Sequence, residues 1–292
     1  MTRIRALVIV NPAARRAAAE LDGAVRAFAA AGAACDVMST RAPGHAAELA
    51  REHAGKYSMV FVLAGDGSAV EVIGALAGRG PAVGVLPGGT GNLLARALGI
   101  PMRVADAVPA LLKGRERRVD LGQLADGRYF AIGLGVGVDE AMIANASREL
   151  KRRIGFLAYF WSGTLAGLKV ERIAYRLTTD GVVREGHAVS VLVANLGTVL
   201  GGLITLGEDI RPDDGILHVV IFAPRTVWDS IRVFGRMLTG GVANDPCVSS
   251  VAGRNIRLET MPPRRAQADG ELLGVTPMDI VVRPGAARLL VP

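Results

Sequence analysis

Two loops in this sequence place glycines beside a carboxylate, a hydroxyl or an amide, directly before a helical pattern. Ala64-Gly65-Asp66-Gly67-Ser68 follows the apolar run Val60–Leu63, and Pro87 to Asn92 (PGGTGN) follows the run Ala82–Leu86. Glycine lets a backbone approach a ligand closely, and a helix N-terminus offers unpaired N–H groups and the positive end of the helix dipole. Such loops suit phosphate groups, and Asp66 suits the Mg²⁺ that phosphates carry. A plain helix cap with tight-turn glycines is the alternative for either loop taken alone.

Two further turns carry candidate chemistry. Asn11-Pro12 follows the first apolar run, and Asp269-Gly270-Glu271 sets two carboxylates around one glycine. A hydroxyl nucleophile needs a carboxylate to take its proton, although Asp-Gly is also an ordinary hairpin signal. The sequence contains neither GxxxxGK[ST] nor a strand-ending GxGxxG with a suitably placed acid, which excludes a Walker loop and a dinucleotide fingerprint.

The elements that must position these loops alternate regularly over the first 120 residues. Short apolar runs end in turns, and amphipathic helical patterns follow them, which predicts a parallel sheet with helices on both faces. In such folds ligands bind at the carboxyl ends of the strands, where both glycine loops fall. The expected strands are Ala6–Val10, Cys35–Met38, Met59–Leu63 and Ala82–Leu86, and the expected helices are 17–31, 44–54, 68–79 and 92–98.

The pattern changes after about residue 120 to strands paired through turn signals. Turns are expected at 125–128 and at 179–181, and helices at about 139–168 and 225–240. The uncharged stretch 188–207 alternates like a strand and then meets glycines, so we interpret it as a buried strand and loop rather than a membrane span. Further strands are expected at 216–222, 254–260, 278–283 and 288–291. The sequence thus predicts an α/β domain over 1–122, which 284–292 would complete, and a mainly antiparallel β domain over 123–283.

Composition limits the partners of the chain. Half of the 292 residues are apolar, and the formal net charge of +7 favours anionic partners such as phosphates or acidic lipid surfaces. No RNP-like or zinc-finger-like pattern accompanies the scattered arginines, so nucleic acid is not expected as a partner. Cys35 and Cys247 lie far apart and imply no disulfide framework, and the N-terminus lacks the pattern of a signal peptide. We therefore expect a cytosolic protein.

Taken in order, these motifs resemble those of the soluble diacylglycerol kinase and sphingosine kinase family of lipid kinases, a superfamily that also includes NAD kinases and 6-phosphofructokinases. The ordered set extends over nearly the whole chain and is specific, whereas no single member is. The matching stretches are Asn11-Pro12, Thr40 before Gly44-His45-Ala46, Ala64 to Ser68 with Glu71, Pro87 to Arg96, Gly99-Ile100-Pro101, Lys151 to Tyr159 (KRRIGFLAY), Pro212 to Val219 and Asp269-Gly270-Glu271.

The resemblance implies an ATP-dependent lipid kinase of phospholipid metabolism, with a nucleotide in the cleft between an α/β domain and a β-sandwich-like domain. It implies a base in the DGE turn, for which we favour Glu271 over Asp269, although the sequence does not separate the two. It also implies Mg²⁺, bound structurally by Asp214 with the main-chain carbonyls of Arg211 and Ile216, and Asp66 beside the metal of the nucleotide. The expected ATP-binding residues are Asn11, Pro12, Thr40, Gly65, Asp66, Gly67, Ser68, Glu71, Gly89, Thr90 and Asn92.

Three departures from the family pattern bear on nucleotide use. Ala64 stands where the family has the first glycine of GGDGT, Ser68 replaces its threonine, and Val70 replaces the asparagine before Glu71. The serine keeps a hydroxyl, while the valine removes a polar contact. Two alternatives therefore stay open: a kinase of a soluble alcohol related to NAD kinase, and a non-catalytic regulator that binds a nucleotide or a lipid.

Access to a lipid requires contact with a bilayer. Lys151, Arg152 and Arg153 precede Phe156 and a cluster of aromatic residues ending at Trp161, which suits peripheral binding to an anionic membrane. Packing of a helix against the protein core is the alternative for the same spacing. Diacylglycerol is the first acceptor implied, but a sphingoid base, an isoprenoid alcohol and phosphatidylglycerol fit the motifs equally well. A homodimer is left open.

Overall fold

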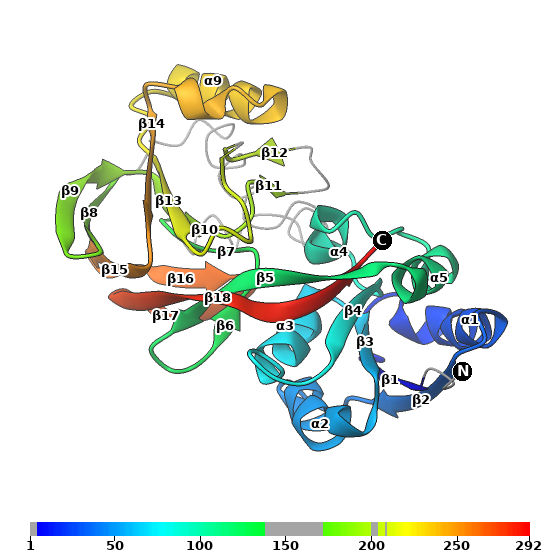
Figure 1. Cartoon of the computed structure of the whole chain (residues 1–292). Helices are drawn as coiled ribbons and strands as arrows, with labels where there is room; N and C mark the ends of the chain where they lie inside the picture. The colour runs from blue at the N-terminus through cyan, green and yellow to red at the C-terminus, as the bar shows by residue number, and fades with distance from the viewer. Residues whose placement is uncertain (1–4, 138–171, 200–203, 208) are drawn as a thin grey trace. The chain divides into compact units, whose positions relative to one another are not determined.

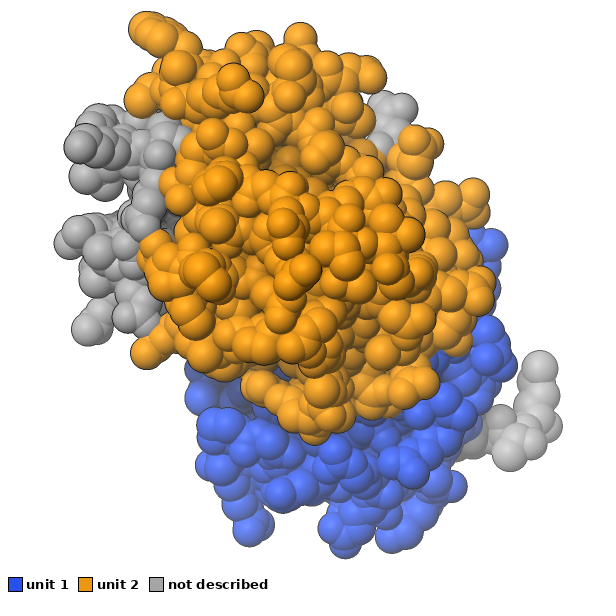
Figure 2. Space-filling view, turned by 90° about the vertical axis from the view of Figure 1, so that its left-hand side faces the viewer, with its two compact units in different colours: residues 1–119, 285–292 blue, residues 120–284 orange. Residues whose placement is uncertain are grey.

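A computed structural model describes residues 5–137, 172–199, 204–207 and 209–292 of the chain. The chain forms two compact units: residues 1–119 with 285–292, called unit 1, and residues 120–284, called unit 2 (Figure 2). The helix expected at 139–168 and the basic-aromatic segment 151–161 lie outside the described residues. Within the described ranges, no helix combines the length and the hydrophobicity that crossing a bilayer requires.

Unit 1 is built on a parallel sheet whose strands run in the order β2-β1-β3-β4 (Figure 1). Nearly every residue of β1, β3 and β4 is buried, because helices cover both faces of the sheet. The end of strand β18 adds to the sheet in parallel, with Leu289 opposite Val83. The four strands are β1 (Arg5–Val10), β2 (Ala34–Ser39), β3 (Met59–Ala64) and β4 (Ala82–Pro87).

The helices of unit 1 lie in two pairs on opposite sides of the sheet, α1 with α5 and α2 with α3 (Figure 1). Phe28 of α1 meets Phe61 of β3 edge to face, with ring centroids 4.8 Å apart. The alternation of strands and helices confirms the α/β fold expected from the sequence. The helices are α1 (Ala17–Ala30), α2 (His45–His53) followed by η1 (Ala54–Lys56), α3 (Asp66–Ala75), α4 (Leu93–Ala97) and α5 (Val104–Lys113).

Helix α5 was not among the helices predicted from the sequence. Pro109 lies inside it, where proline removes one helical hydrogen bond and normally signals a break. Val104, Ala107, Val108 and Leu111 are all fully buried, at 0% exposure. Burial of this apolar face outweighs the lost hydrogen bond, so the helix persists through the proline.

Unit 2 consists of antiparallel strands in two layers, as the sequence predicted. One layer pairs β9, β8, β15 and the first part of β18, with β5 and β6 at its side, and the other has the order β14-β13-β10-β7-β16-β17. The strands are β5 (Arg115–Leu124), β6 (Tyr129–Phe130), β7 (Gly133–Val136), β8 (Ile173–Thr179), β9 (Val182–Ala188), β10 (Ser190–Ala194), β13 (Leu217–Phe222), β14 (Val248–Gly253), β15 (Asn255–Met261), β16 (Arg265–Ala268), β17 (Glu271–Val275) and β18 (Met278–Val291), with the short pair β11 (Thr198–Val199) and β12 (Ile204–Thr205).

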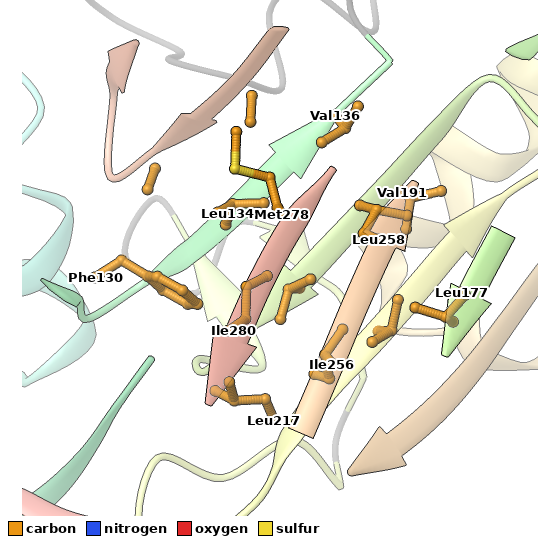
Figure 3. Packing of buried hydrophobic residues seen from close by; sticks show 14 of the residues in the cluster. Phe130, Leu134, Val136, Leu177, Val191, Leu217, Ile256, Leu258, Met278 and Ile280 are labelled. Carbon is orange, nitrogen blue, oxygen red and sulfur yellow. The ribbon is translucent and has the colours of Figure 1, made fainter. Parts of the chain in front are cut away.

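The core of unit 2 lies between the two layers (Figure 3). Leu134 and Val191 from β7 and β10 meet Leu177, Ile256 and Leu258 from β8 and β15 in one buried apolar cluster. Alternate residues of each strand point into this cluster, which is the pattern of a β-sandwich. The strand expected near residue 190 is β10, a buried strand of the sandwich, and not part of a membrane-spanning helix.

Helix α9 (Val227–Thr239), which precedes η2 (Val242–Asn244), is held by two ion pairs to one buried carboxylate. Arg232 Nε lies 3.0 Å and Arg236 Nη1 3.3 Å from Oδ2 of Asp245, whose side chain is fully buried. A capping box of Thr226 and Asp229 fixes the first turn of the helix, and Gly240 ends it with φ of 82°. Burial opposes ionisation of Asp245, but the Arg232 guanidinium prevails and holds the pKa of that carboxyl below its usual value.

We expect Asp245→Asn to lower the free energy of unfolding at pH 7 by about 1–3 kcal/mol, since it removes a charged partner from two arginines. The lowered pKa means that the carboxylate stabilises the fold at a pH above about 3.9, the unfolded value, and that this contribution is lost as the pH falls through the folded pKa. Urea unfolding of both proteins between pH 3 and pH 7 measures the effect. A difference that stays constant over this range would contradict the ion pair as its source.

Candidate functional site

The candidate residues fall in both units. In unit 1 they gather at the carboxyl ends of β1 to β4, at one edge of the parallel sheet, as the strand pattern predicted. Thr40 follows β2 and is buried, and its N–H donates to the carbonyl of Val10 at 2.8 Å. The loops after β3 and β4 lie side by side because their strands pair up to Ala64 opposite Pro87.

The two glycine loops touch each other through their backbones. A Cβ atom on Gly89 would lie 2.6 Å from the Cα of Gly65, and one on Gly88 would lie 2.9 Å from the backbone N of Ala64. The N–H of Gly88 donates to the carbonyl of Ala64 at 2.9 Å, and the N–H of Arg16 donates to the carbonyl of Gly88 at 2.9 Å. Close backbone packing thus accounts for part of the glycine content that the sequence analysis attributed to phosphate binding.

This packing predicts that the effect of a glycine-to-alanine substitution on stability depends strongly on its position. Gly89→Ala should lower the free energy of unfolding by about 1–3 kcal/mol, because the new methyl group meets backbone that cannot move aside. Gly23→Ala, inside α1, is the matched control and should be neutral or stabilising, because a Cβ atom there would have no other atom within 4 Å. Chemical denaturation of both variants checks the pair. Equal stability for the two would show that the loops separate easily.

Asn92 closes the second loop upon itself. Its side-chain Oδ1 accepts from the N–H of Gly89 at 2.8 Å, and its Nδ2 donates to the carbonyl of Gly89 at 3.0 Å. The residue has φ of 48° and is 4% exposed, so its side chain fixes the conformation of the loop directly before α4. Thr90, at the tip of the loop, stays half-buried.

Asp66 connects the two loops electrostatically. It is the first residue of α3, and its Oδ1 accepts from the N–H of Leu94, in the first turn of α4, at 3.0 Å. Burial raises the pKa of Asp66, against the lowering effect of this and neighbouring backbone N–H groups. Its other oxygen faces Gly91, where a Cβ atom would lie 3.3 Å from Oδ2. Asp66 therefore already positions the second loop, apart from any contact with a metal.

Asn11 connects the end of β1 with the start of α3. Its Nδ2 donates to Oγ of Ser68 at 2.9 Å, and its Oδ1 accepts from the N–H of Ala13 at 3.0 Å. The adjacent Pro12 is exposed. Glu71, one turn into α3, accepts from the N–H of Gly44 at 3.0 Å and so holds the loop before α2. The hydroxyl that Ser68 retains is thus a partner of Asn11.

In unit 2 the structure separates the two carboxylates of the DGE turn. Asp269 has φ of 50°, and its carboxylate accepts from the N–H groups of Ala131, Ile132 and Gly133 at 2.6, 2.9 and 3.0 Å. Glu271 begins β17 and is exposed. Arg128 has a raised pKa, chiefly because of its hydrogen bond to Asp126 and in smaller part because of the nearby charge of Glu271. Asp269 therefore holds a backbone segment, whereas Glu271 lies at an exposed position two residues later.

The turn that contains Asp214 offers oxygen atoms that could bind a metal ion. Oδ1 of Asp214 accepts from the N–H of Ile216 at 3.1 Å, and Oδ2 lies 3.5 Å from Nε2 of His218. Arg211 pairs with Asp213 at 3.6 Å. Among the described residues, no group of three or more His, Cys, Asp or Glu side chains is placed to hold a metal ion. One carboxylate with main-chain carbonyls fits Mg²⁺ in ligand type, with water completing the coordination.

Two buried residues that the sequence analysis did not select connect the 131–133 segment with this turn. Asn195 is 1% exposed, and its Nδ2 donates to the carbonyls of Asp120 and Ala131 at 2.7 and 2.8 Å. Asp120 is 2% exposed, and its Oδ2 accepts from the N–H of Gly215 at 2.6 Å. For Asn195 the available signal was a lone polar residue just after an apolar strand, since such a residue needs buried partners, whereas Asp120 lies in a strand with several other charged residues and does not stand out.

Comparison with known proteins places this geometry in a family. Residues 5–124 match the family model described as the diacylglycerol kinase catalytic domain, and residues 133–291 match the YegS C-terminal NAD kinase beta sandwich-like domain. The chain belongs to the diacylglycerol kinase-like family of lipid kinases. Both the family expected from the motifs and the two-part fold are thereby confirmed. A kinase family implies ATP as the phosphate donor.

Individual relatives support the assignment to this family. A diacylglycerol kinase of Bacillus subtilis (strain 168) is 29% identical over 95% of this chain and 93% of its own length. A Pseudomonas aeruginosa protein named "Probable lipid kinase YegS-like" is 33% identical over 94% of this chain and 90% of its own. The crystal structure of a diacylglycerol kinase from Bacillus anthracis superposes with a TM-score of 0.84 at 26% identity, covering 100% of this chain and 98% of that one. The chain spans 55% of the length of another relative, an uncharacterised Synechocystis protein that is 26% identical.

Proposed function

We propose that this lipid kinase transfers the γ-phosphoryl group of MgATP to the hydroxyl group of a membrane lipid, with diacylglycerol as the first acceptor to test. The observation that carries the proposal is the pair of glycine loops that meet at Gly65 and Gly89 in the part of the chain that matches the catalytic-domain family. The DGE turn, in which Glu271 is exposed while Asp269 accepts backbone hydrogen bonds, supports it from unit 2.

Unit 1 supplies the groups for the nucleotide. The first turn of α3, from Asp66 to Ser68, is half-buried, and the leading N–H groups of a helix have no acceptor within it. These groups and the half-buried hydroxyl of Thr90 suit phosphate oxygens. The Mg²⁺ that accompanies ATP neutralises phosphate charge during transfer. In the loop after β1, Arg16 forms an ion pair with Glu20 at 2.6 Å, whereas Arg15 is exposed. Arg15 is therefore the arginine of this loop that we expect to contact a phosphate group.

Glu271 is our assignment for the base. The acceptor oxygen forms a bond to the γ-phosphorus while the bond from that phosphorus to the β,γ-bridging oxygen breaks, and ADP leaves with the bonding electrons. The proton of the acceptor hydroxyl goes to the Glu271 carboxylate. Arg128 places a positive charge in the neighbourhood of this carboxylate, since the charge of Glu271 contributes in small part to the raised pKa of Arg128. Asp269 keeps the turn in place through the three N–H groups that it holds.

The experiment is transfer of ³²P from γ-labelled MgATP to diacylglycerol, a sphingoid base, phosphatidylglycerol and NAD, with the lipids in mixed micelles. Asp66→Asn is the control variant, because an amide oxygen still accepts from Leu94 N–H but a neutral side chain no longer attracts the metal of the nucleotide. We expect label in a lipid with the wild-type protein and none with the variant, which should stay folded by circular dichroism. Label in NAD alone, or normal transfer by Asp66→Asn, would contradict the proposal.

A further inference from the structure

Helix α9 exposes an apolar stripe on the side opposite its anchor. Ser230, Val233 and Met237 are at most 1% exposed and fasten the helix to unit 2. Trp228, Ile231 and Leu238 are 78%, 37% and 43% exposed. Their spacing, with exposed Gly235 between the last two, places them along one face of the helix. Figure 1 shows α9 at the periphery of unit 2, at the top of the view.

Positive charge lies beside this stripe. Arg232 and Arg236 flank it along the helix, each with a side chain 40% exposed, and exposed Arg225 lies just before the first turn. Asp229, 20% exposed, and the fully buried Asp245 are the acidic partners of Arg232 and Arg236 and balance two of the three positive charges, but the arginine side chains are more exposed than the carboxylates. An apolar face with a large aromatic residue beside an arginine flank is the pattern of a helix that lies in a membrane interface.

We infer that the stripe Trp228–Ile231–Leu238 is the surface through which this kinase rests on an anionic phospholipid bilayer. The inference rests on the proposed function, since a lipid acceptor is found in a bilayer. Charge complementarity selects this occupant: arginines meet anionic headgroups while the apolar side chains enter the acyl boundary. A second copy of the chain fits less well, because a two-fold contact repeats the same patch and would set the two arginine flanks against each other.

Depth-dependent fluorescence quenching tests the surface without reference to catalysis. The chain has two tryptophans, so Trp161→Phe leaves Trp228 as the single tryptophan, which can be excited selectively at about 295 nm. On vesicles of phosphatidylcholine with phosphatidylglycerol that carry brominated acyl chains, Trp228 emission should shift to shorter wavelength and be quenched. Its emission should stay unchanged on phosphatidylcholine alone at the same lipid concentration. Absence of quenching on the anionic vesicles would overturn the inference.

Flotation with the same vesicles measures the contribution of the stripe. Ile231→Asp with Leu238→Asp should weaken partitioning by about 100-fold, at roughly tenfold for each side chain. Val182→Asp with Val183→Asp is the matched control, since these exposed valines, 54% and 49%, lie at the start of β9. The control should bind vesicles like the wild type. Equal loss in the control pair, or none in the α9 pair, would overturn the inference.

A monomeric acceptor separates this inference from the proposed function. With dihexanoylglycerol below its critical micelle concentration, the α9 pair should phosphorylate at the wild-type rate, while turnover on vesicle-borne diacylglycerol falls with binding. Loss of turnover on both acceptors, with vesicle binding retained, would contradict the surface assignment. Wild-type inactivity on both, with Trp228 still quenched, would reject diacylglycerol as the acceptor and leave the membrane surface supported. A dimer in light scattering that Leu238→Asp dissociates, with vesicle binding unchanged, would assign the stripe to a second copy instead.

Discussion

Glu271→Gln will lower turnover of lipid phosphorylation by about 10²–10⁴-fold, the usual contribution of a positioned general base. Glutamine keeps the size of the side chain and its hydrogen-bonding oxygen but does not accept the proton of the acceptor hydroxyl. Because Glu271 is exposed at the start of β17, the free energy of unfolding should stay within about 0.5 kcal/mol of the wild-type value. The KM for ATP should also stay unchanged, since the base acts on the other substrate.

Steady-state kinetics over a pH range gives the decisive measurement. In the wild type, the acidic limb of the turnover profile reports protonation of the base, and this limb should disappear in Glu271→Gln along with the rate. Glu185→Gln is a matched control, because Glu185 is an exposed strand glutamate of the same unit, paired on the surface with Arg176 at 3.0 Å. It should retain full turnover. Retention of more than half of the activity by Glu271→Gln would remove this residue from the role of base.

Asp269→Ala, unlike Glu271→Gln, will greatly lower the free energy of unfolding. Removing the carboxylate leaves the N–H groups of Ala131, Ile132 and Gly133 without their acceptor, and these hydrogen bonds are made to a charged group. We expect the free energy of unfolding to fall by about 2–4 kcal/mol, a value that allows for water replacing part of the lost bonding at this half-buried position. Asp269→Asn keeps one acceptor oxygen and should fall between the wild type and the alanine variant.

Hydrogen exchange locates this effect. Exchange at 131–133 should accelerate in Asp269→Ala before global unfolding does, since the carboxylate protects these N–H groups directly. Asp126→Ala is the control, because it removes an exposed carboxylate paired with Arg128, and surface pairs contribute about 0–1 kcal/mol. If Asp269→Ala were as stable as the wild type yet as inactive as Glu271→Gln, the roles of the two carboxylates would have to be exchanged.

The layers of the fold could be predicted because buried positions in strands and helices are occupied by apolar residues at regular spacings in the sequence. Continuous apolar runs before turns identified β1 to β4, and the Asp-Gly turn at 180–181 identified the hairpin of β8 and β9. Helix α5 was not predicted, although its buried residues Val104, Ala107, Val108 and Leu111 recur at helical spacing; Pro109 inside it is a local signal against a helix that burial of this face outweighs. The type and order of the strands and helices could thus be predicted where the local sequence signals agreed with each other.

The candidate site was predictable in location but not in the division of roles. Strand ends and glycines pointed to Gly65 and Gly89, yet nothing in the sequence indicates that these two backbones touch. Asp269 and Glu271 look equivalent in the chain, because the N–H groups that distinguish Asp269 belong to residues more than 130 positions away. Asn195 and Asp120 were missed for a similar reason, since their side-chain partners, Asp120 and Gly215, lie 75 and 95 positions away in the chain.

Strand β18 has a consequence for the order in which the protein is made. Its first part pairs with β15, while its last part reaches β4 through Leu289, and Arg288 pairs with Glu116 at 2.6 Å. The parallel sheet near the start of the chain is therefore completed only when the last residues have been synthesised, about 200 residues after Pro87. Until then the edge of β4 is open, and an open strand edge recruits other strands. A fragment ending near residue 119 should aggregate, and adding residues 285–292 as a separate peptide should suppress that aggregation.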